Sequence, residues 1–488
     1  MCRKQEEGRA AGEEKGDGAG EEKGESREGV AASTMVDMAS ETAHGHATER
    51  MPTRETVAGA ARHPIVLWIA FLIVHIWLGW LCLNADGLPL GDVTLVYKPW
   101  AQQAETGMAV VGITAPWVYP PLALVPIMMP LLVGAAQYAG GWLTMVLLFD
   151  AAAFAVLTVN RGRRATAAAW WWLAFLVLLG PIAIARLDAV SVAIVVVALL
   201  WLHTRPRVAA VLLAVATWIK VWPAALIAAV FVVSRDRWRM LMAVFATSLV
   251  VVILVITFGG ATNLFSFITQ QTGRGLQIEA PISLPWMWAA AAHQPGNFVY
   301  YDRNILTFQV TGPGIDTAIA LMTPLLAIAV VVVLVFGIRA TYHGAPALVV
   351  LPPLSLALVA TLIAFNKVGS PQYIAWLAAP VILGIVCNGK HFTVPAILVG
   401  VTAALTQLVY PYLYIWLLYS NPNPMMLGVL TIRNVMEFVV LGCALWMLWR
   451  SAAAGGTNLD AGVVVELDDA SASFAESAPF AEIDDRKE

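Results

Sequence analysis

Residues 64–84 read PIVLWIAFLIVHIWLGWLCLN, and no Asp, Glu, Lys or Arg interrupts them. A helix needs about 20 mostly apolar residues to cross the hydrocarbon core of a bilayer, and this run has that length. Further apolar segments follow along the chain. They are 119–138, 141–159, 166–185, 188–204, 207–233, 239–258, 316–338, 346–365, 371–387, 392–411 and 428–449. The sequence therefore predicts an all-α polytopic membrane protein, a bundle of about 12 apolar segments.

The composition of the chain places it in the same class. Of the 488 residues, 59% are hydrophobic and 12% are charged. An average soluble domain is ~45–50% apolar and ~25% charged. The difference excludes an ordinary soluble enzyme, a disordered chain and a secreted disulfide scaffold. The four cysteines show no paired or metal-ligand spacing, so we expect neither a disulfide framework nor a zinc site.

The two ends of the chain differ from its middle. Residues 1–62 and 450–488 are polar and rich in Gly, Ala, Ser and Glu, and they cannot bury enough apolar surface to offset chain entropy. We therefore expect two disordered cytoplasmic tails around an integral membrane domain at 63–449. That domain contacts membrane lipids, and no nucleic-acid partner is expected.

Basic residues between the apolar segments predict how the chain crosses the membrane, because Lys and Arg in short loops favour the cytoplasmic side. Simple alternation from a cytoplasmic N-terminus would place the arginines of 161–164 and 205–207 outside. Both groups become cytoplasmic if 119–159 crosses a net odd number of times and 207–233 folds back. Lys220 favours the fold-back, because a Lys in the bilayer centre costs ~2.5–3.5 kcal/mol.

In that topology the outer face gathers four polar elements. They are the long connections 85–118 and 259–315, the turn 186–188 and the stretch 366–373. Long connections in an otherwise terse chain are more often functional than mere linkers. We therefore expect a multi-pass cell-membrane protein with two long extracytoplasmic loops and an extracytoplasmic active site.

Asp92 differs from the other carboxylates of the membrane domain. It lies in LGDV at 90–93, just after the first apolar segment, and an aromatic-rich stretch follows it. A carboxylate there can meet a polar head group while a lipid chain stays in the bilayer. The alternative interpretation is an ordinary loop acid or helix cap. Asp150 and Glu437 lie inside apolar segments, where each either acts directly or pairs with an internal partner.

The second long connection contains GRGLQIE at 273–279. Its polar side chains, Arg274, Gln277 and Glu279, alternate with small and apolar ones, and glycine on both sides of Arg274 allows close backbone approach. The alternative for this connection is a structural cap over the bundle. Lys367 lies between long apolar runs, so we expect an anion beside it, either a substrate phosphate or an internal carboxylate.

Carboxylates, Arg and Lys at a membrane surface suit a substrate with a lipid phosphate. Sugar transfer from a polyprenyl phosphate needs a base for the acceptor hydroxyl and cations for the leaving phosphate. Inversion in one step needs a single catalytic carboxylate. The sequence has no DxD motif, so we expect cationic side chains in place of a metal ion, and no cofactor.

Several segments together resemble glycosyltransferase family 87. They are the acidic first outer loop, YPPL at 119–122, IKVWP at 219–223, RGLQIE at 274–279 and KVGSPQY at 367–373. The family consists of GT-C-fold membrane enzymes, mostly actinobacterial mannosyltransferases that use polyprenyl phosphate mannose. The resemblance covers roughly 64–450 and rests on the order and spacing of these segments.

The resemblance implies transfer of a hexose, mannose in the family, from a polyprenyl phosphate sugar to a glycolipid or cell-envelope glycan, with inversion. It implies that Asp92 is the catalytic base. The expected substrate-binding residues are Arg274, Gln277, Glu279, Lys367, Gln372, Tyr373, Arg186, Asp188 and Lys220. Relatives often carry a Gly-Gln or Asn-rich turn at 186–188, and this departure makes Asp188 a rival to Asp92 for the base.

Two other functions stay open at the level of sequence. A transporter or lipid flippase would also be a polytopic bundle. Transporters often show inverted repeats and charged broken helices at the midplane, and this chain has no evident repeat. A non-catalytic assembly subunit would tolerate loss of the outer acids.

Overall fold

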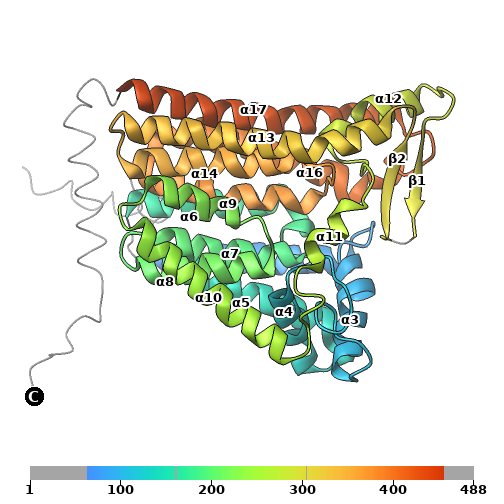
Figure 1. Ribbon diagram of the computed structural model, residues 1–488, viewed down its shortest axis with the longest axis horizontal. Helices are drawn as coiled ribbons and strands as arrows, with labels where there is room; N and C mark the ends of the chain where they lie inside the picture. The colour runs from blue at the N-terminus through green and yellow to red at the C-terminus, as the bar shows by residue number, and fades with distance from the viewer. Residues whose placement is uncertain (1–62, 160–161, 304, 455–488) are drawn as a thin grey trace, which may run out of the picture. The chain divides into compact units, whose positions relative to one another are not determined.

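The structure, a computed structural model, describes residues 63–159, 162–303 and 305–454. The longer helices are α2 (Pro64–Asn84), α5 (Tyr138–Thr158), α6 (Arg163–Leu179), α7 (Leu187–Trp201), α10 (Arg237–Thr257), α13 (Ile315–Tyr342), α14 (Ala347–Ala364), α16 (Thr393–Gln407) and α17 (Pro424–Ala454). The shorter ones are α3 (Lys98–Glu105), α4 (Leu124–Met128), α8 (Pro206–Ile219), α9 (Ala224–Val233), α11 (Ser266–Thr272), α12 (Leu284–Ala291) and α15 (Ala378–Asn388). Figure 1 shows these helices as a bundle.

Eight helices within the described residues are long and apolar enough to cross a membrane, and they support a helical, polytopic membrane protein. Four shorter apolar helices cover 121–133, 187–201, 206–219 and 224–233. The first helix, α2, begins at Pro64, where a missing backbone donor costs nothing. The His63 side chain before it accepts a hydrogen bond from Ile65 N at 3.3 Å.

The predicted segment 119–138 is not one helix. Its residues form short 3-10 and α turns between Pro121 and Gln137, and a continuous helix begins only at α5. It contains four prolines, Pro120, Pro121, Pro126 and Pro130. Each proline removes a backbone donor and crowds the preceding turn, so a spanning helix is disfavoured. A single helix, α5, therefore crosses the bundle within 119–159. One crossing agrees with the odd number of crossings that the positions of the basic residues predicted for this segment.

The predicted fold-back of 207–233 is present in the structure. Helix α8 ends at Ile219, helix α9 begins at Ala224, and Lys220 and Pro223 lie between them. Residues from the start of α8 and the end of α9, such as Ala210 and Val230, line one small cavity. The two helices are therefore antiparallel, and this segment does not cross the bundle as one span.

Two further regions differ in detail from the sequence predictions. The predicted segments 371–387 and 392–411 contain the helices α15 and α16, with Gly389 between them at a φ of +53°, but the first segment begins with the 3-10 turn Pro371–Leu377. The predicted loop 259–315 contains α11, α12 and a hairpin of β1 (Phe298–Asp302) and β2 (Thr307–Thr311), in register from Phe298 with Thr311. The domain is thus helical with one small sheet.

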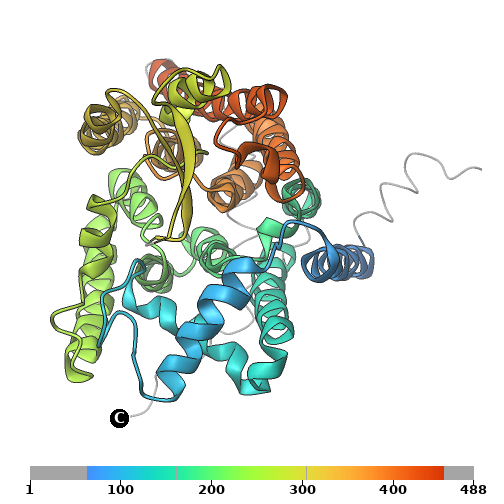
Figure 2. The ribbon, with the colours of Figure 1, turned by 90° about the vertical axis from the view of Figure 1, so that its right-hand side faces the viewer.

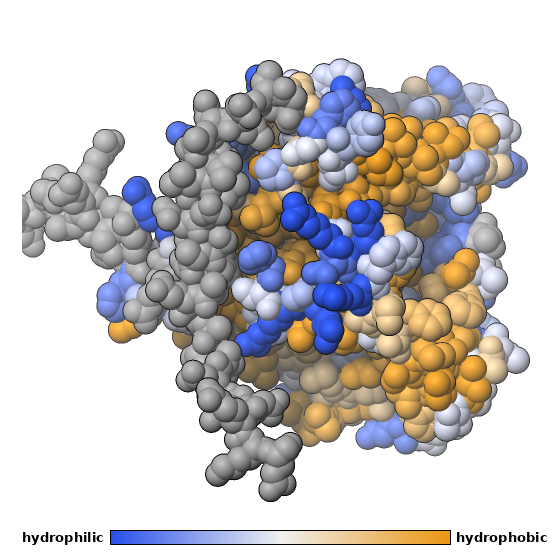
Figure 3. All heavy atoms as spheres, turned by 60° about the vertical axis from the view of Figure 1, so that its left-hand side comes forward, coloured by the Kyte–Doolittle hydropathy of each residue, from blue (hydrophilic) through white to orange (hydrophobic). Residues whose placement is uncertain are grey.

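One end of the bundle gathers basic residues. Arg164 Nη1 donates to Cys387 O at 2.9 Å, and the Arg339 guanidinium lies 3.8 Å from the centroid of the Trp449 ring. Helices α6 and α10 begin at this end, and α13 and α17 end there (Figure 1). Figure 3 shows hydrophilic side chains toward this end beside broad hydrophobic flanks. Their cytoplasmic side stays a prediction.

The opposite end carries the long connections. Figure 2 looks onto it and shows residues 85–118 and the 259–315 region with its hairpin lying across the helix ends. Helices α7 and α14 are almost wholly buried at the centre, whereas α10 and α13 expose most of their apolar surface. Exposed apolar helix surface of this kind is suited to lipid contact.

The predicted tail at 1–62 lies outside the described residues, and so does the predicted tail at 450–488 from residue 455 onward. The helix α17 continues to Ala454, past the predicted boundary of the membrane domain at 449. Among the described cysteines, Cys82 is buried and Cys387 and Cys443 are partly buried, and all three are free thiols.

Candidate active site

Asp92 stands at the start of a short π-helical turn, Val93–Tyr97, which continues into α3. π-helical turns are rare in proteins, and those that occur are often found at functional sites. The Asp92 side chain is 39% exposed, and its Oδ2 lies 3.0 Å from Arg186 Nε. The two groups form an ion pair, but Nε is not aligned for a hydrogen bond. The carboxylate is therefore held beside a cation and still accessible.

Arg186 is fixed by groups other than Asp92. Its Nη1 donates to Pro89 O at 2.6 Å and to Ala185 O at 2.9 Å, and its Nη2 donates to the Tyr410 hydroxyl at 2.9 Å. The residue is 5% exposed. Burial disfavours the charged form, but the Asp92 carboxylate and Tyr410 outweigh burial and raise the pKa of Arg186. Arg186 is a permanent cation in a fixed position.

Asp188, two residues farther on, has a different environment. It is 1% exposed. Its Oδ2 accepts a hydrogen bond from Lys220 Nζ at 3.0 Å and its Oδ1 accepts one from Trp376 Nε1 at 2.6 Å. Lys220 Nζ also lies 4.6 Å from the centroid of the Tyr119 ring. Burial opposes the charge of Lys220, but Asp188 and Tyr119 outweigh it and raise the pKa of Lys220. The Lys220 charge is thus balanced inside the protein.

Arg274 and Lys367 come together from two segments far apart in the chain. Gln277 N donates to Lys367 O at 3.2 Å, and a Cβ at Gly369 would collide with Ala280 N, so the 274–280 and 366–370 backbones touch. Lys367 is 8% exposed. Burial lowers the pKa of Lys367, and the Arg274 guanidinium lowers it further. The two cations thus disfavour each other's charge, and an anion beside them would favour it again.

The predicted residues Gln277, Gln372 and Tyr373 belong to the same region. Gln277 and Gln372 are buried, and Gln372 Oε1 accepts a hydrogen bond from Ser370 Oγ at 2.6 Å. The Tyr373 ring centroid lies 5.9 Å from Lys220 Nζ. Tyr373 therefore joins the Asp188–Lys220 pair to the 366–373 stretch.

Glu279 is buried and bonded within the protein. It is 1% exposed, and it contacts Arg433 Nη2 and accepts a hydrogen bond from the Tyr414 hydroxyl. Arg433 Nη1 also lies 2.7 Å from Glu437 Oε1. Burial raises the pKa of Glu279 to about 7, although the Arg433 cation opposes this rise. The Glu279 carboxylate faces Arg433 rather than open space.

Tyrosines connect these groups into one cluster. The buried Tyr97 hydroxyl has no hydrogen-bond partner in the part of the chain that the structure describes. Burial, then Tyr119 and then Asp92 raise the pKa of Tyr97, and Asp188 contributes as well. Tyr410 and Tyr414 stack edge to face at 5.2 Å and link Arg186 to Glu279. The cluster contains all the predicted site residues: Asp92, Arg186, Asp188, Lys220, Arg274, Gln277, Glu279, Lys367, Gln372 and Tyr373. Their roles stay predictions.

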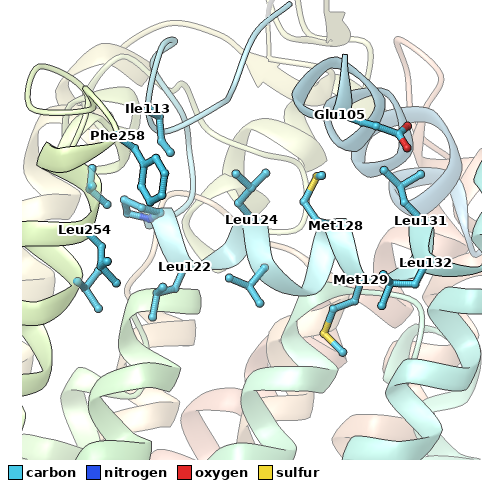
Figure 4. A pocket seen from close by; sticks show the side chains of 14 residues that line it. Glu105, Ile113, Leu122, Leu124, Met128, Met129, Leu131, Leu132, Leu254 and Phe258 are labelled. Carbon is cyan, nitrogen blue, oxygen red and sulfur yellow. The ribbon is translucent and has the colours of Figure 1, made fainter. Parts of the chain in front are cut away.

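An apolar groove of about 640 Å³ is lined mostly by the proline-rich turns after Tyr119 and by the C-terminal end of α10 (Figure 4). The lining residues are Glu105, Ile113, Pro121, Leu122, Leu124, Val125, Met128, Met129, Leu131, Leu132, Val251, Leu254, Val255 and Phe258. The groove begins two residues after Tyr119, whose ring faces Lys220. It can hold an apolar chain whose polar end reaches the cluster.

Within the described ranges, no group of three or more His, Cys, Asp or Glu residues could hold a metal ion. The predicted independence from metal ions is a question for an activity assay, and it stays a prediction.

Sequence reasoning missed several members of the cluster. Arg433 carried a usable signal, because it lies four residues before Glu437 in an apolar segment, so the two charges share one helix face. Glu437 pairs internally with Arg433, as one alternative held. Asp150 pairs internally, as one alternative held: its Oδ2 lies 3.1 Å from His75 Nε2. Tyr410 carried no signal, since its contact with Arg186 joins residues more than 200 positions apart.

Comparison with known families gives one match. The model of glycosyltransferase family 87 matches residues 117–296, less than half of the chain. The matched range contains Arg186, Asp188, Lys220 and the 274–279 segment, and it contains neither Asp92 nor Lys367. No curated protein matches the chain. The match indicates a membrane glycosyltransferase, and it gives neither the donor, nor the sugar, nor the acceptor.

Proposed function

We propose that this protein is a GT-C-type hexosyltransferase of the cell membrane that uses a polyprenyl phosphate sugar. It transfers the hexose, with mannose as the first candidate, to a lipid-linked or cell-envelope glycan on the extracytoplasmic face, with inversion. One observation carries the proposal. Of the four carboxylates in the cluster, the Asp92 side chain is 39% exposed, whereas Asp188, Glu279 and Glu437 are each 1% exposed and bonded to cations.

In the proposed reaction Asp92 accepts the proton of the acceptor hydroxyl. The hydroxyl oxygen forms a bond to the anomeric carbon, and the bond between that carbon and the phosphate oxygen breaks. The bonding electrons leave with the phosphate, whose charge Arg274 and Lys367 stabilise. A single displacement inverts the anomeric configuration. Arg186 lies 3.0 Å from one oxygen of Asp92, whose side chain stays 39% exposed.

The apolar groove supplies a place for the prenyl chain of the donor. Its volume of about 640 Å³ is within the ~300–1,000 Å³ of ordinary ligand sites. Thirteen of its fourteen lining residues are apolar, and Figure 4 shows Leu122, Met128 and Leu254 around the same space. Because lipid tails are as apolar as the groove lining, the groove would position the prenyl chain rather than gain hydrophobic free energy from it. A chain held there brings its phosphate toward the Lys220 side of the cluster.

The transporter alternative has less support. Alternating-access transporters place the substrate near the bilayer midplane, between repeated halves. Here Asp92 and the 274–279 segment belong to the long connections, which lie across the helix ends at one end of the bundle (Figure 2).

Transfer by the purified protein in lipid vesicles tests the proposal directly. Radiolabelled polyprenyl phosphate mannose, glucose and arabinose are offered with an envelope lipid extract. Transfer is expected for the unmodified protein and for Asp86→Asn, a matched control in the exposed loop next to α2. Asp92→Asn should transfer the sugar ~10²–10⁴-fold more slowly. Passage of the labelled lipid across sealed vesicles with no glycosylated product would support the transporter instead.

The groove is tested by filling it. Val255→Trp places a large ring in the lining, and Ile253→Trp, two residues away on the exposed face of α10, is the matched control. Val255→Trp should raise the KM for a long-chain donor and leave the KM for a two-isoprene donor unchanged. An equal change for both donors would show that the groove does not hold the chain.

A further inference from the structure

Arg433 occupies an unusual position for a cation. It lies in α17 and is 1% exposed, and among the described residues it forms ion pairs with two carboxylates, Glu279 and Glu437. Taking three charges out of water costs several kcal/mol each, and this cost is offset only by close mutual contacts. Arg433 Nε and Glu437 Oε2 even lack hydrogen-bond partners in the described part of the chain. Buried charges and unsatisfied polar atoms are uncommon in proteins, so this group calls for a functional explanation.

The contacts of Glu279 tie one short loop to α17. Arg433 holds the Glu279 carboxylate, and Asn434 Nδ2 donates to the Glu279 main-chain oxygen at 3.3 Å. Two consecutive residues of one helix therefore fix both the side chain and the backbone of Glu279. The Tyr414 hydroxyl adds a third contact. The backbone at Glu279 thus has little freedom.

The same backbone supports the two cations of the donor side. Gln277 N donates to Lys367 O at 3.2 Å, and Gly369 packs so closely on Glu279 and Ala280 that a Cβ would not fit. Arg274 lies five residues before Glu279 on the same loop. A shift of Glu279 would therefore move the loop that carries Arg274 and the segment that carries Lys367.

We propose that Arg433 is a positioning residue, which fixes the 274–280 loop through Glu279 and so sets the distance between Arg274 and Lys367. The proposal rests on the proposed function, in which these two cations receive the donor phosphate. It gives Glu279 a supporting role in place of the substrate contact expected from sequence. Arg433 itself does not touch the substrate. It can hold two carboxylates at once because its guanidinium offers several donors in a fixed plane.

The test compares Arg433→Lys with Glu437→Gln. The Lys variant keeps the charge but cannot bridge both carboxylates, whereas Glu437→Gln disturbs the same buried group and leaves Arg433 with Glu279. Arg433→Lys should raise the KM for the donor ~10- to 100-fold, the range expected for a displacement of about 1 Å, and leave the KM for the acceptor unchanged. Glu437→Gln should change the donor KM less than threefold, even where it lowers the Tm as much.

A merely structural role predicts a different outcome. Both variants would then lower the Tm and leave the donor KM within about twofold at temperatures where they stay folded. That outcome would overturn the proposal. If Arg433→Lys fails to fold, Asn434→Leu serves instead, because it removes one contact to Glu279 and keeps the buried charges. We expect it to raise the donor KM roughly threefold, and no change would count against the proposal.

A labelling experiment separates this proposal from the proposed function. Ser370→Cys, in a background without other cysteines, places a thiol on the segment that rests on Glu279. Its reaction with a water-soluble maleimide should be faster with Arg433→Lys than with Arg433, at equal folded fraction. If the labelling responds but no sugar is transferred by any variant, the positioning role stands and the proposed function falls. Unchanged labelling would overturn the positioning role.

Discussion

The turn 186–188 contributes to two ion pairs of nearly the same geometry and opposite character. Arg186 lies 3.0 Å from Asp92, and Asp188 lies 3.0 Å from Lys220. The Asp92 side chain is 39% exposed, whereas the Asp188 side chain is 1% exposed. The distance between the charges is the same, so distance alone cannot tell a reactive group from a structural one.

Burial and the remaining partners make the difference. Both oxygens of Asp188 accept hydrogen bonds, from Lys220 and from Trp376. Arg186 instead binds two main-chain oxygens and Tyr410, so it keeps its position without help from Asp92. The carboxylate of Asp92 can therefore exchange its partner for a substrate proton, while that of Asp188 cannot do so without leaving Lys220 buried and unpaired.

The largest expected effect belongs to Asp92→Asn. The amide keeps the shape of the side chain and cannot act as a base, so kcat should fall ~10²–10⁴-fold. The Tm should fall less than it does for Asp188→Asn, because Asp92 is 39% exposed and Arg186 keeps its three hydrogen bonds. Transfer assays and thermal unfolding in detergent measure both quantities. Near-normal turnover would remove Asp92 from the reaction.

Asp188→Asn should act on stability instead. Loss of one partner of a buried ion pair costs about 3–5 kcal/mol, because the other charge stays buried and unpaired. Asp188→Asn combined with Lys220→Met should recover much of the loss. The matched control is Asp236→Asn, which breaks the exposed pair with Arg239 and should cost about 0–1 kcal/mol.

One result would reverse this comparison. If Asp188→Asn unfolds at the temperature of the unmodified protein and abolishes transfer, while Asp92→Asn stays active, the base is Asp188. Unfolding curves and initial rates from the same preparations distinguish the two cases.

Periodicity and apolar run length sufficed to predict the class of fold. Segments such as 64–84 are long, unbroken and apolar, and they became helices with nearly the expected bounds. The fold-back at Lys220 was also predictable, because a charge and a proline interrupt an apolar run. The broken conformation of the segment 119–138 was not predicted. Its apolar residues indicated a spanning helix, but its four prolines prevent a continuous helical backbone.

The contacts within the site were predictable only in part. Residue types in polar loops indicated Asp92, Arg274 and Lys367, and the structure gathers them. The partner of each charge depends on tertiary packing. Lys220 pairs with Asp188, and Glu279 pairs with Arg433, which is 154 positions away in the sequence. No local sequence pattern indicates such a pairing, so the sequence analysis predicted that Asp188 and Glu279 contact the substrate.

A smaller effect is expected for Arg274→Lys. The proposed Arg274–phosphate contact can be bidentate, and Lys preserves the charge without this geometry. The donor KM should rise roughly tenfold, about 1.4 kcal/mol, with the acceptor KM unchanged. Arg303→Lys, at an exposed position beside the hairpin, is the matched control. Equal donor KM values for Arg274→Lys and the unmodified protein would exclude Arg274 from the phosphate contact.

The smallest expected effect is a pH dependence of donor binding that belongs to Lys367. Burial and the Arg274 cation lower the pKa of Lys367 in the free protein, and a bound phosphate would favour the charged form again. Donor binding is therefore strongest below this lowered pKa and weakens as the pH rises through it. A loss of about 1 kcal/mol would raise the donor KM roughly fivefold.

Lys367→Arg should abolish this rise, because Arg stays protonated at every accessible pH. Glu279, whose pKa burial raises to about 7, is present in both proteins, so a difference between the two profiles belongs to Lys367. Identical profiles would assign the pH dependence elsewhere and remove Lys367 from the phosphate contact.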